Sequence, residues 1–216
     1  MRKKYSWLFL ISVVLLFSCY DDDTELIESI DATHRSSELT GLIKSMTLHN
    51  ASFDDHIDNT SCYSLVFPYD LNVNSVTKRI TSIQDVNSIN ENDQTEILYP
   101  VDVVFFDYSQ FEVNSRTELS VVTNSCEEDF TIEHNPCLNF EYPITINEFN
   151  EMNSTFEAIT IDSNKKAFEY LSTLHDSDVY EIDYPVTLLD SNVEPNIVNS
   201  NAEFIDAFIS SVNSCQ

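Results

Sequence analysis

The stretch Leu138–Ile146, which reads Leu-Asn-Phe-Glu-Tyr-Pro-Ile-Thr-Ile, carries the pattern that decides the predicted fold. Apolar residues alternate with mostly polar ones along it, and a period of two is typical of a β-strand with one buried face. The aromatic residue before the proline lies on the apolar face. Proline cannot donate to a strand ladder, so we expect it at a sheet edge or a bulge.

The same pattern occurs four times along the chain, and each copy is followed by a second short strand and a serine that begins a helix. The aromatic-proline pairs are Phe67-Pro68, Tyr99-Pro100, Tyr142-Pro143 and Tyr184-Pro185, and the serines are Ser82, Ser115, Ser163 and Ser200. An acid follows three residues after the serine in three copies, at Asp85, Glu118 and Glu203, which is typical of a capping box. The third copy has Lys166 there. These features predict a β-β-α unit that is repeated four times.

The predicted fold class is α+β, with antiparallel sheets covered by amphipathic helices. The clearest helical face is the last one, made of Phe204, Ile205, Phe208, Ile209 and Val212. Paired units form two β-β-α-β-β-α modules, a first module at residues 62–126 and a second module at 137–216, joined by an acidic linker at 127–136. Residues 36–61 precede them as a helix, at about 36–48, and a loop.

The amino terminus resembles a lipoprotein signal. Arg2, Lys3 and Lys4 are followed by an apolar run from Trp7 to Phe17, which has signal-peptide length. The segment Leu16-Phe17-Ser18-Cys19 then resembles the bacterial lipobox, which implies removal of residues 1–18 and acylation of Cys19. The alternative is an ordinary signal peptide in which the cysteine is incidental.

An acidic segment at residues 19–35 begins with the lipid cysteine. Its start, Tyr20-Asp21-Asp22-Asp23-Thr24-Glu25, resembles the export tag of surface lipoproteins in the Bacteroidota. The resemblance implies an outer-membrane lipoprotein that faces the cell exterior. A solvated tether is the other interpretation, and the two are compatible.

Four cysteines remain after Cys19, which predicts two disulfides in an exported chain. Cys62 and Cys137 each lie six residues before a repeat proline, and Cys126 and Cys215 each end the helix of an even-numbered unit. Equivalent positions favour Cys62–Cys126 and Cys137–Cys215. The rival pairing joins Cys126 to Cys137 and Cys62 to Cys215.

Composition excludes several classes of function. The whole chain has 37 acidic and 10 basic residues and a formal charge of −27. Removing the three basic residues of the signal leaves seven, so the mature chain carries −30, a charge that repels nucleic acid. Gly41 is the only glycine. The dinucleotide fingerprint, the P-loop and the nucleophile elbow each need more than one glycine, so these three motifs are excluded.

No catalytic, cofactor or metal site is predicted. The densest group of metal-ligand residue types is His49, Asp54, Asp55, His56 and Asp58, and we interpret it as a polar loop before the first strand. The acid pair Glu127-Glu128 falls in the predicted linker. Carboxylates are so abundant in this chain that their proximity in sequence carries little weight.

The run Ile57–Tyr63, the recurring aromatic-proline strands and the Val-Asn-Ser helix starts together resemble a family of uncharacterised flavobacterial (Bacteroidota) surface lipoproteins. The likeness covers most of the mature chain, although the family has more glycine at its hairpins. It implies strands, caps and cysteines in these places and assigns no catalytic residue.

The expected function is non-enzymatic binding or adhesion at the cell surface, with an extracellular polymer or protein as ligand and the membrane contacted through the lipid anchor. One alternative is an extracellular hydrolase, or an accessory subunit of one, acting on a polymer. A structural protein of the envelope is a third. The sequence does not indicate the ligand or the oligomeric state.

Overall fold

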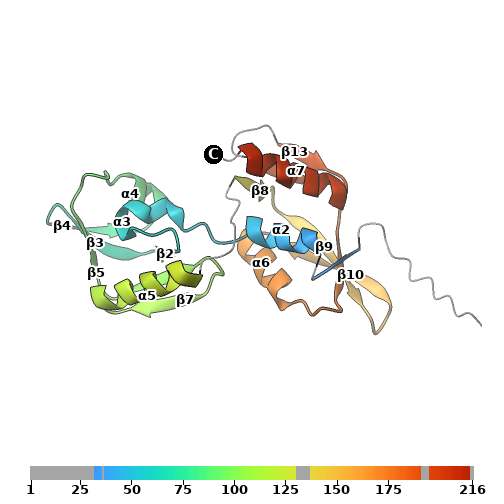
Figure 1. Cartoon of the computed structure of the whole chain (residues 1–216), viewed down its shortest axis with the longest axis horizontal. Coiled ribbons are helices and arrows are strands. Elements are labelled where there is room, and N and C mark those ends of the chain that lie inside the picture. Colours follow the sequence, from blue (N-terminus) through green and yellow to red (C-terminus); the bar gives the residue numbers. More distant parts are fainter. Residues whose placement is uncertain (1–31, 36, 130–136, 191–194, 215–216) are drawn as a thin grey trace, which may run out of the picture. The chain divides into compact units, whose positions relative to one another are not determined.

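The computed structural model describes residues 32–35, 37–129, 137–190 and 195–214. These residues belong to one contact unit that extends from Asp31 to Gln216. Their fold is α+β, with α-helices and several small antiparallel sheets (Figure 1).

The elements follow one another in a regular order. The first part contains β1 (Thr33–His34), α2 (Glu38–Met46), the 3-10 helix η1 (Ser52–Asp54), α3 (Asp55–Asp58), β2 (Tyr63–Leu65), β3 (Tyr69–Val73), β4 (Val76–Ile80), α4 (Ile83–Asn87), β5 (Thr95–Leu98), β6 (Val101–Phe105), β7 (Gln110–Val113) and α5 (Arg116–Asp129). The second part contains β8 (Leu138–Phe140), β9 (Ile144–Asn150), β10 (Thr155–Ile161), α6 (Asn164–Thr173), β11 (Val179–Ile182), β12 (Val186–Asp190), β13 (Asn196–Val198) and α7 (Asn201–Ser214).

Each stretch predicted as one long strand is two strands, and the prediction of continuous strands is wrong. The peptide bonds before Pro68, Pro100, Pro143 and Pro185 are all cis. The strand before each proline pairs in one sheet and the strand after it pairs in another, as when β2 pairs with β6 while β3 pairs with β4 and β5. Proline therefore separates two sheets rather than marking an edge or bulge of one.

Two sheets occur within residues 62–126, and two more are formed by strands of residues 137–216, one of which β1 extends. The first pair has the orders β4-β3-β5 and β2-β6-β7, and the second pair has the orders β13-β12-β8 and β1-β11-β9-β10. The pairing between strands occurs at matching positions. Leu71 lies opposite Ile97, and Ile146 lies opposite Ile182, so in both cases a residue three after one proline meets a residue three before the next.

The alternating apolar residues fill two separate cores. One core consists of residues of the first module with Ile57, and includes Tyr63, Leu71 and Val103, which are fully buried. The other core consists of second-module residues and α2, which packs against α6 and α7 (Figure 1). Leu39, Ile43 and Met46 of α2 are all buried there, so the helix predicted at about 36–48 is confirmed.

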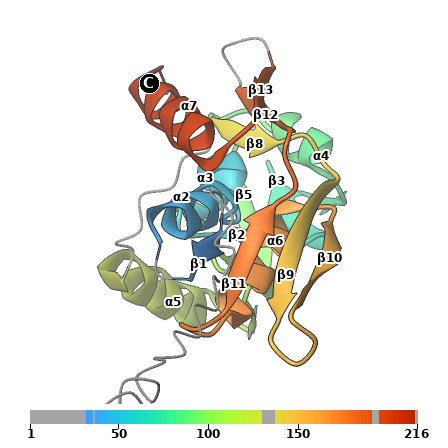
Figure 2. The ribbon, with the colours of Figure 1, turned by 90° about the vertical axis from the view of Figure 1, so that its right-hand side faces the viewer.

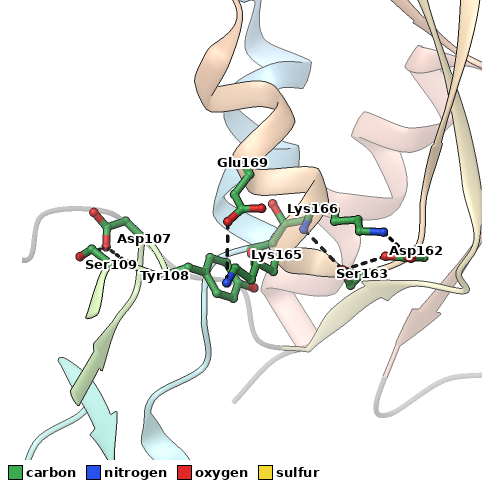
Figure 3. Close-up of polar contacts among 9 residues, drawn as sticks. Asp107, Tyr108, Ser109, Asp162, Ser163, Lys165, Lys166 and Glu169 are labelled. Carbon is green, nitrogen blue, oxygen red and sulfur yellow. Dashed lines mark hydrogen bonds and ion pairs between the residues drawn. The ribbon is translucent and has the colours of Figure 1, made fainter. Parts of the chain in front are cut away.

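Serine caps begin the helices as predicted. Ser82 Oγ accepts from Asp85 N–H, and Ser200 Oγ accepts from Glu203 N–H. At α6 the lysine is compatible with a cap, because Ser163 Oγ accepts from the backbone N–H of Lys166 (Figure 3). The Lys166 ammonium donates to Asp162 Oδ2, so it pairs with an acid outside the helix.

Helix α5 extends beyond the predicted end of the first module. It runs to Asp129 and so includes Cys126 and the acids Glu127 and Glu128, which were assigned to the linker. The segment therefore begins as helix, and the predicted linker is at least three residues too long at this end.

Removing the last cap tests the helix assignment. Ser200→Ala should cost about 1 kcal/mol of unfolding free energy, because Glu203 N–H loses its acceptor at the start of α7. Ser210→Ala on the exposed side of the same helix is the matched control and should be neutral or slightly stabilising, since alanine has the higher helix propensity. Urea unfolding of both variants measures the difference. Equal effects would show that the cap contributes nothing.

Candidate functional site

One hollow of the first module is a groove along β5. Residues of α3, β5 and the start of α5 line it, and its volume is about 580 Å³. We call it the β5 groove and define it by Asp58, Thr95, Ile97, Tyr99 and Arg116. It forms because β5 is the last strand of the order β4-β3-β5.

The groove has mixed chemistry. Arg116, the first residue of α5, is exposed and makes no ion pair with any described residue. Burial raises the pKa of the Tyr99 hydroxyl, and the charge of Arg116 nearby partly offsets that rise. Glu96 adds a negative charge to the lining. Hydroxyl and amide side chains supply its other polar groups, at Asn59, Asn114, Ser115, Ser120 and Thr123. Such a surface can hydrogen-bond a polar ligand and place one positive charge against it.

Two aspartates that the sequence placed in a polar loop are buried, and one of them, Asp58, lines this groove. Asp54 is 0% exposed and Asp58 is 8% exposed. Asp54 Oδ2 accepts from Leu65 N–H at 2.8 Å, which satisfies a backbone donor of the short strand β2. Asp58 Oδ1 accepts from Thr60 N–H at 3.2 Å and so fixes the turn that leads into β2. The predicted polar loop is in fact η1 and α3, and Ile57 between these acids belongs to the core.

The remaining oxygens of these aspartates lack partners among the described residues. Asp54 Oδ1, Asp58 Oδ2 and the hydroxyl of Tyr69 are all buried without a hydrogen bond there. Burial raises the pKa of Asp54 to about 7 and that of Asp58 to about 9, and the neighbouring Asp54 carboxylate adds to the rise at Asp58. Asp58 therefore holds its proton at neutral pH. We call these three groups the Asp54–Asp58–Tyr69 cluster.

Two other members of the acid and histidine group have serine partners. Asp55 Oδ2 accepts from Ser61 Oγ, and His49 Nε2 is 2.7 Å from Ser64 Oγ. Within the ranges that the structure describes, no three His, Cys, Asp or Glu side chains are arranged to hold a metal ion.

The structure describes the side chains of only two of the predicted cysteines. Cys62 is buried directly before β2, and the sulfur atoms of Cys62 and Cys137 are both in disulfide bonds. The side chains of Cys126 and Cys215 lie outside the described residues, so the choice between the two pairings stays a prediction. Cys19 also lies outside them.

Two further hollows occupy matching places in the two modules, beside the last helix and the last hairpin of each. The hollow of the first module has a volume of about 530 Å³ and is lined by Phe105, Phe111, Val121 and Val122. That of the second module has a volume of about 750 Å³ and is lined by Asp190, Glu203 and Asp206 among others. One is thus apolar and the other acidic, so they suit different ligands.

Sequence reasoning missed both the groove and the buried aspartates. The groove depends on which strand ends a sheet, and no pattern within β5 reports that. Asp54 could be found only from its contact with Leu65, eleven residues further along the chain.

Comparisons with protein-family models, with curated proteins and with solved structures found no match to this chain. Among the described helices, none combines the length and apolar composition that crossing a membrane requires.

Proposed function

We propose that this chain is an exported, lipid-anchored protein of the outer membrane, displayed toward the cell exterior, whose role is to bind a polymer or protein. The β5 groove is the observation that carries the binding role. It is open and offers hydrogen-bonding side chains with a single cation. The anchor is supported by the lipobox-like segment that ends in Cys19 and by the acidic segment after it.

We further propose that the chain consists of four copies of one unit and that the units form two modules. The matching strand registers support this arrangement. A side-chain contact supports it as well. The Tyr142 hydroxyl donates to Asn164 and the Tyr184 hydroxyl donates to Asn201, so in both copies the tyrosine before the proline contacts the first residue of the following helix.

The symmetric disulfides, Cys62–Cys126 and Cys137–Cys215, belong to the same proposal. Each would join the first strand of a module to its last helix. Two equivalent modules are expected to have equivalent disulfide bonds. In the chain-entropy model, a disulfide that closes a loop of this length stabilises the folded state by about 4 kcal/mol.

The anchor is tested by Cys19→Ala. We expect the native protein to stay with the membrane and to release peptides of residues 62–214 when intact cells are treated with protease. The Cys19→Ala protein should be lost from the membrane fraction, because it has no residue to acylate. Mass spectrometry of released and retained peptides measures both.

Tyr20→Ala, next to the acylated position, is the matched control and should be retained like the native protein. Peptides that appear only after the outer membrane is opened would contradict display at the surface. Retention of Cys19→Ala would contradict the lipid anchor.

A further inference from the structure

The chain itself completes one sheet edge with an added strand. β1 lies antiparallel beside β11, with Thr33 opposite Tyr180 (Figure 2). Thr33 is only 3% exposed, and Asn201 Nδ2 donates to its hydroxyl at 3.0 Å. Asn201 is the first residue of α7, and its Oδ1 accepts from the Tyr184 hydroxyl at 2.8 Å. The edge of β11, the helix start and the tyrosine before the proline together hold this strand.

β5 has the place in the first module that β11 has in the second. Thr95 and Tyr180 each lie five residues before a repeat proline. Thr95 pairs with Val73 and Tyr180 pairs with Glu148, and both of these partners lie five residues after the preceding proline. Both strands therefore have the same register within their sheets.

On both β5 and β11, the alternation of hydrogen bonds along the strand directs the backbone groups at corresponding positions toward the open edge of the sheet. Asn74 N–H donates to Gln94 C=O between β3 and β5. Because antiparallel pairs alternate between facing and non-facing backbone groups, Thr95 and Ile97 direct their N–H and C=O away from β3 and toward the groove. In the part of the chain that the structure describes, β5 has a strand partner on the β3 side alone.

On β11 the corresponding bond has the same phase. Asp183 N–H donates to Thr145 C=O, which directs the backbone of Tyr180 outward to Thr33 of β1. The β5 groove is therefore the place in the first module that an added strand fills in the second.

One residue of the two sites differs in charge. Counting from the capping serines, Arg116 stands where Asn201 stands, since each directly follows its serine. Tyr99 likewise corresponds to Tyr184. The amide of Asn201 recognises the hydroxyl of Thr33, whereas the guanidinium of Arg116 suits a carboxylate, with which arginine can form two parallel hydrogen bonds.

We propose that the β5 groove binds an extended peptide segment of another protein as an added antiparallel strand, with a carboxylate of that segment paired with Arg116. This inference rests on the proposed binding function and specifies its ligand. Main-chain hydrogen bonds to Thr95 and Ile97 supply affinity, and the contact with Arg116 supplies specificity.

Charge favours a segment with one carboxylate at that position and neutral or basic residues elsewhere. The mature chain carries a formal charge of −30, and Glu96 lies beside Thr95 on β5. An evenly acidic segment is therefore repelled, whereas a single carboxylate opposite Arg116 meets the cation of the groove. A second copy of this chain has the same acidic character and is the less suitable occupant.

The probe is a synthetic peptide with the sequence of residues 29–36, in which asparagine replaces Asp31 and the position of Thr33 carries aspartate. The comparison peptide, called the unchanged threonine peptide, has the same asparagine and keeps Thr33. Each peptide is titrated into the mature full-length chain that carries Cys19→Ala. This variant has no acyl chains and needs no detergent. The amide signals of β5 and β11 are followed by NMR. We expect hydrogen-exchange protection to increase at Thr95 and Ile97. The aspartate peptide should bind about tenfold more tightly than the unchanged threonine peptide.

Backbone methylation of the peptide tests the strand geometry. Methylation of the aspartate nitrogen removes the N–H that donates to Thr95 C=O and should abolish binding. Methylation at the preceding alanine should leave binding within about threefold, because that N–H faces the other way in an antiparallel pair.

Arg116→Gln tests the acidic preference, and Lys78→Gln in β4 of the same module is the control with the same charge change. Arg116→Gln should make the aspartate and threonine peptides bind equally, while Lys78→Gln should preserve the tenfold preference. If Lys78→Gln also removes it, the preference reflects overall charge and the assignment of Arg116 is wrong.

Three other results would refute the proposal. One is no binding up to about 1 mM of either peptide, a concentration that detects interactions as weak as about −4 kcal/mol. A second is binding that is insensitive to the position of methylation, or that protects Tyr180 instead of Thr95. A third is that the free protein self-associates and the peptide dissociates this assembly. That result would identify a second copy of the chain as the occupant of the groove. None of these results depends on the lipid anchor, so failure here is distinct from failure of the membrane experiment.

Discussion

Asp58→Asn is expected to stabilise the protein at pH 8.5 by at most about 6 kcal/mol of unfolding free energy and to change little at pH 4. The physical reason is the burial of Asp58, which raises the pKa of its carboxyl from 3.8 to about 9. Each unit of such a rise corresponds to about 1.4 kcal/mol between the protonation states. Asparagine keeps the acceptor for Thr60 N–H and removes the proton equilibrium.

The sign follows from proton binding in the two states. Below pH 3.8 both the folded and the unfolded chain hold the proton, so the stabilising effect of the neutral form is fully present. Between about pH 4 and 9 the folded state binds more protons at Asp58 than the unfolded state, so stability falls as the pH rises. Asp54→Asn should act likewise over the narrower window from about pH 4 to 7.

Urea unfolding between pH 4 and 9 measures the effect. Asp102→Asn is the matched control, because its side chain is exposed on β6 of the same module, and it should change the unfolding free energy little. If the slope of Asp58→Asn equals that of the native protein, Asp58 is charged in the folded state and a cation or an ordered hydrogen-bond network must compensate for it.

Phe204→Ala should cost about 3 to 5 kcal/mol, the usual range for removing a fully buried phenylalanine. Phe204 is 0% exposed at the start of α7, and the centre of its ring lies 5.7 Å from that of Phe140. Both rings belong to the core that includes α2. Urea unfolding measures the loss of unfolding free energy, and hydrogen exchange shows which strands lose protection.

The control is Phe156→Ala in the same module, where the ring is 41% exposed on β10 and should cost less than about 1 kcal/mol. Because the two cores share no residue, Phe204→Ala should increase exchange in β8 and β12 and leave β3 protected. Equal loss of protection in β3 would show that both cores unfold together.

Local patterns sufficed for much of the fold. Alternation predicted the strand residues, and serine with an acid three residues later predicted the starts of α4, α5 and α7. Both signals arise from neighbours in sequence, which is why they can be read without a structure. The end of α5 was missed, because its acids have the composition of a linker although the backbone continues as helix to Asp129.

The candidate site could not be predicted in the same way. The sequence of Thr95–Leu98 is that of an ordinary strand, and its open edge exists only because β3 pairs on one side and no described strand pairs on the other. The burial of Asp54 likewise depends on its bond to Leu65 across the loop. Both properties are set by contacts between segments distant in the chain.

The sequence by itself determined the α+β class, the strand faces, the helix starts and the expectation of an exported, lipid-anchored acidic protein, because each depends on residues close together or on composition. Tertiary structure alone decided that each repeat proline separates two sheets, that Asp54 and Asp58 are buried, and that β11 receives β1 while β5 faces a groove. These depend on which strands meet, and pairing is selected by the packing of whole faces rather than by any single strand.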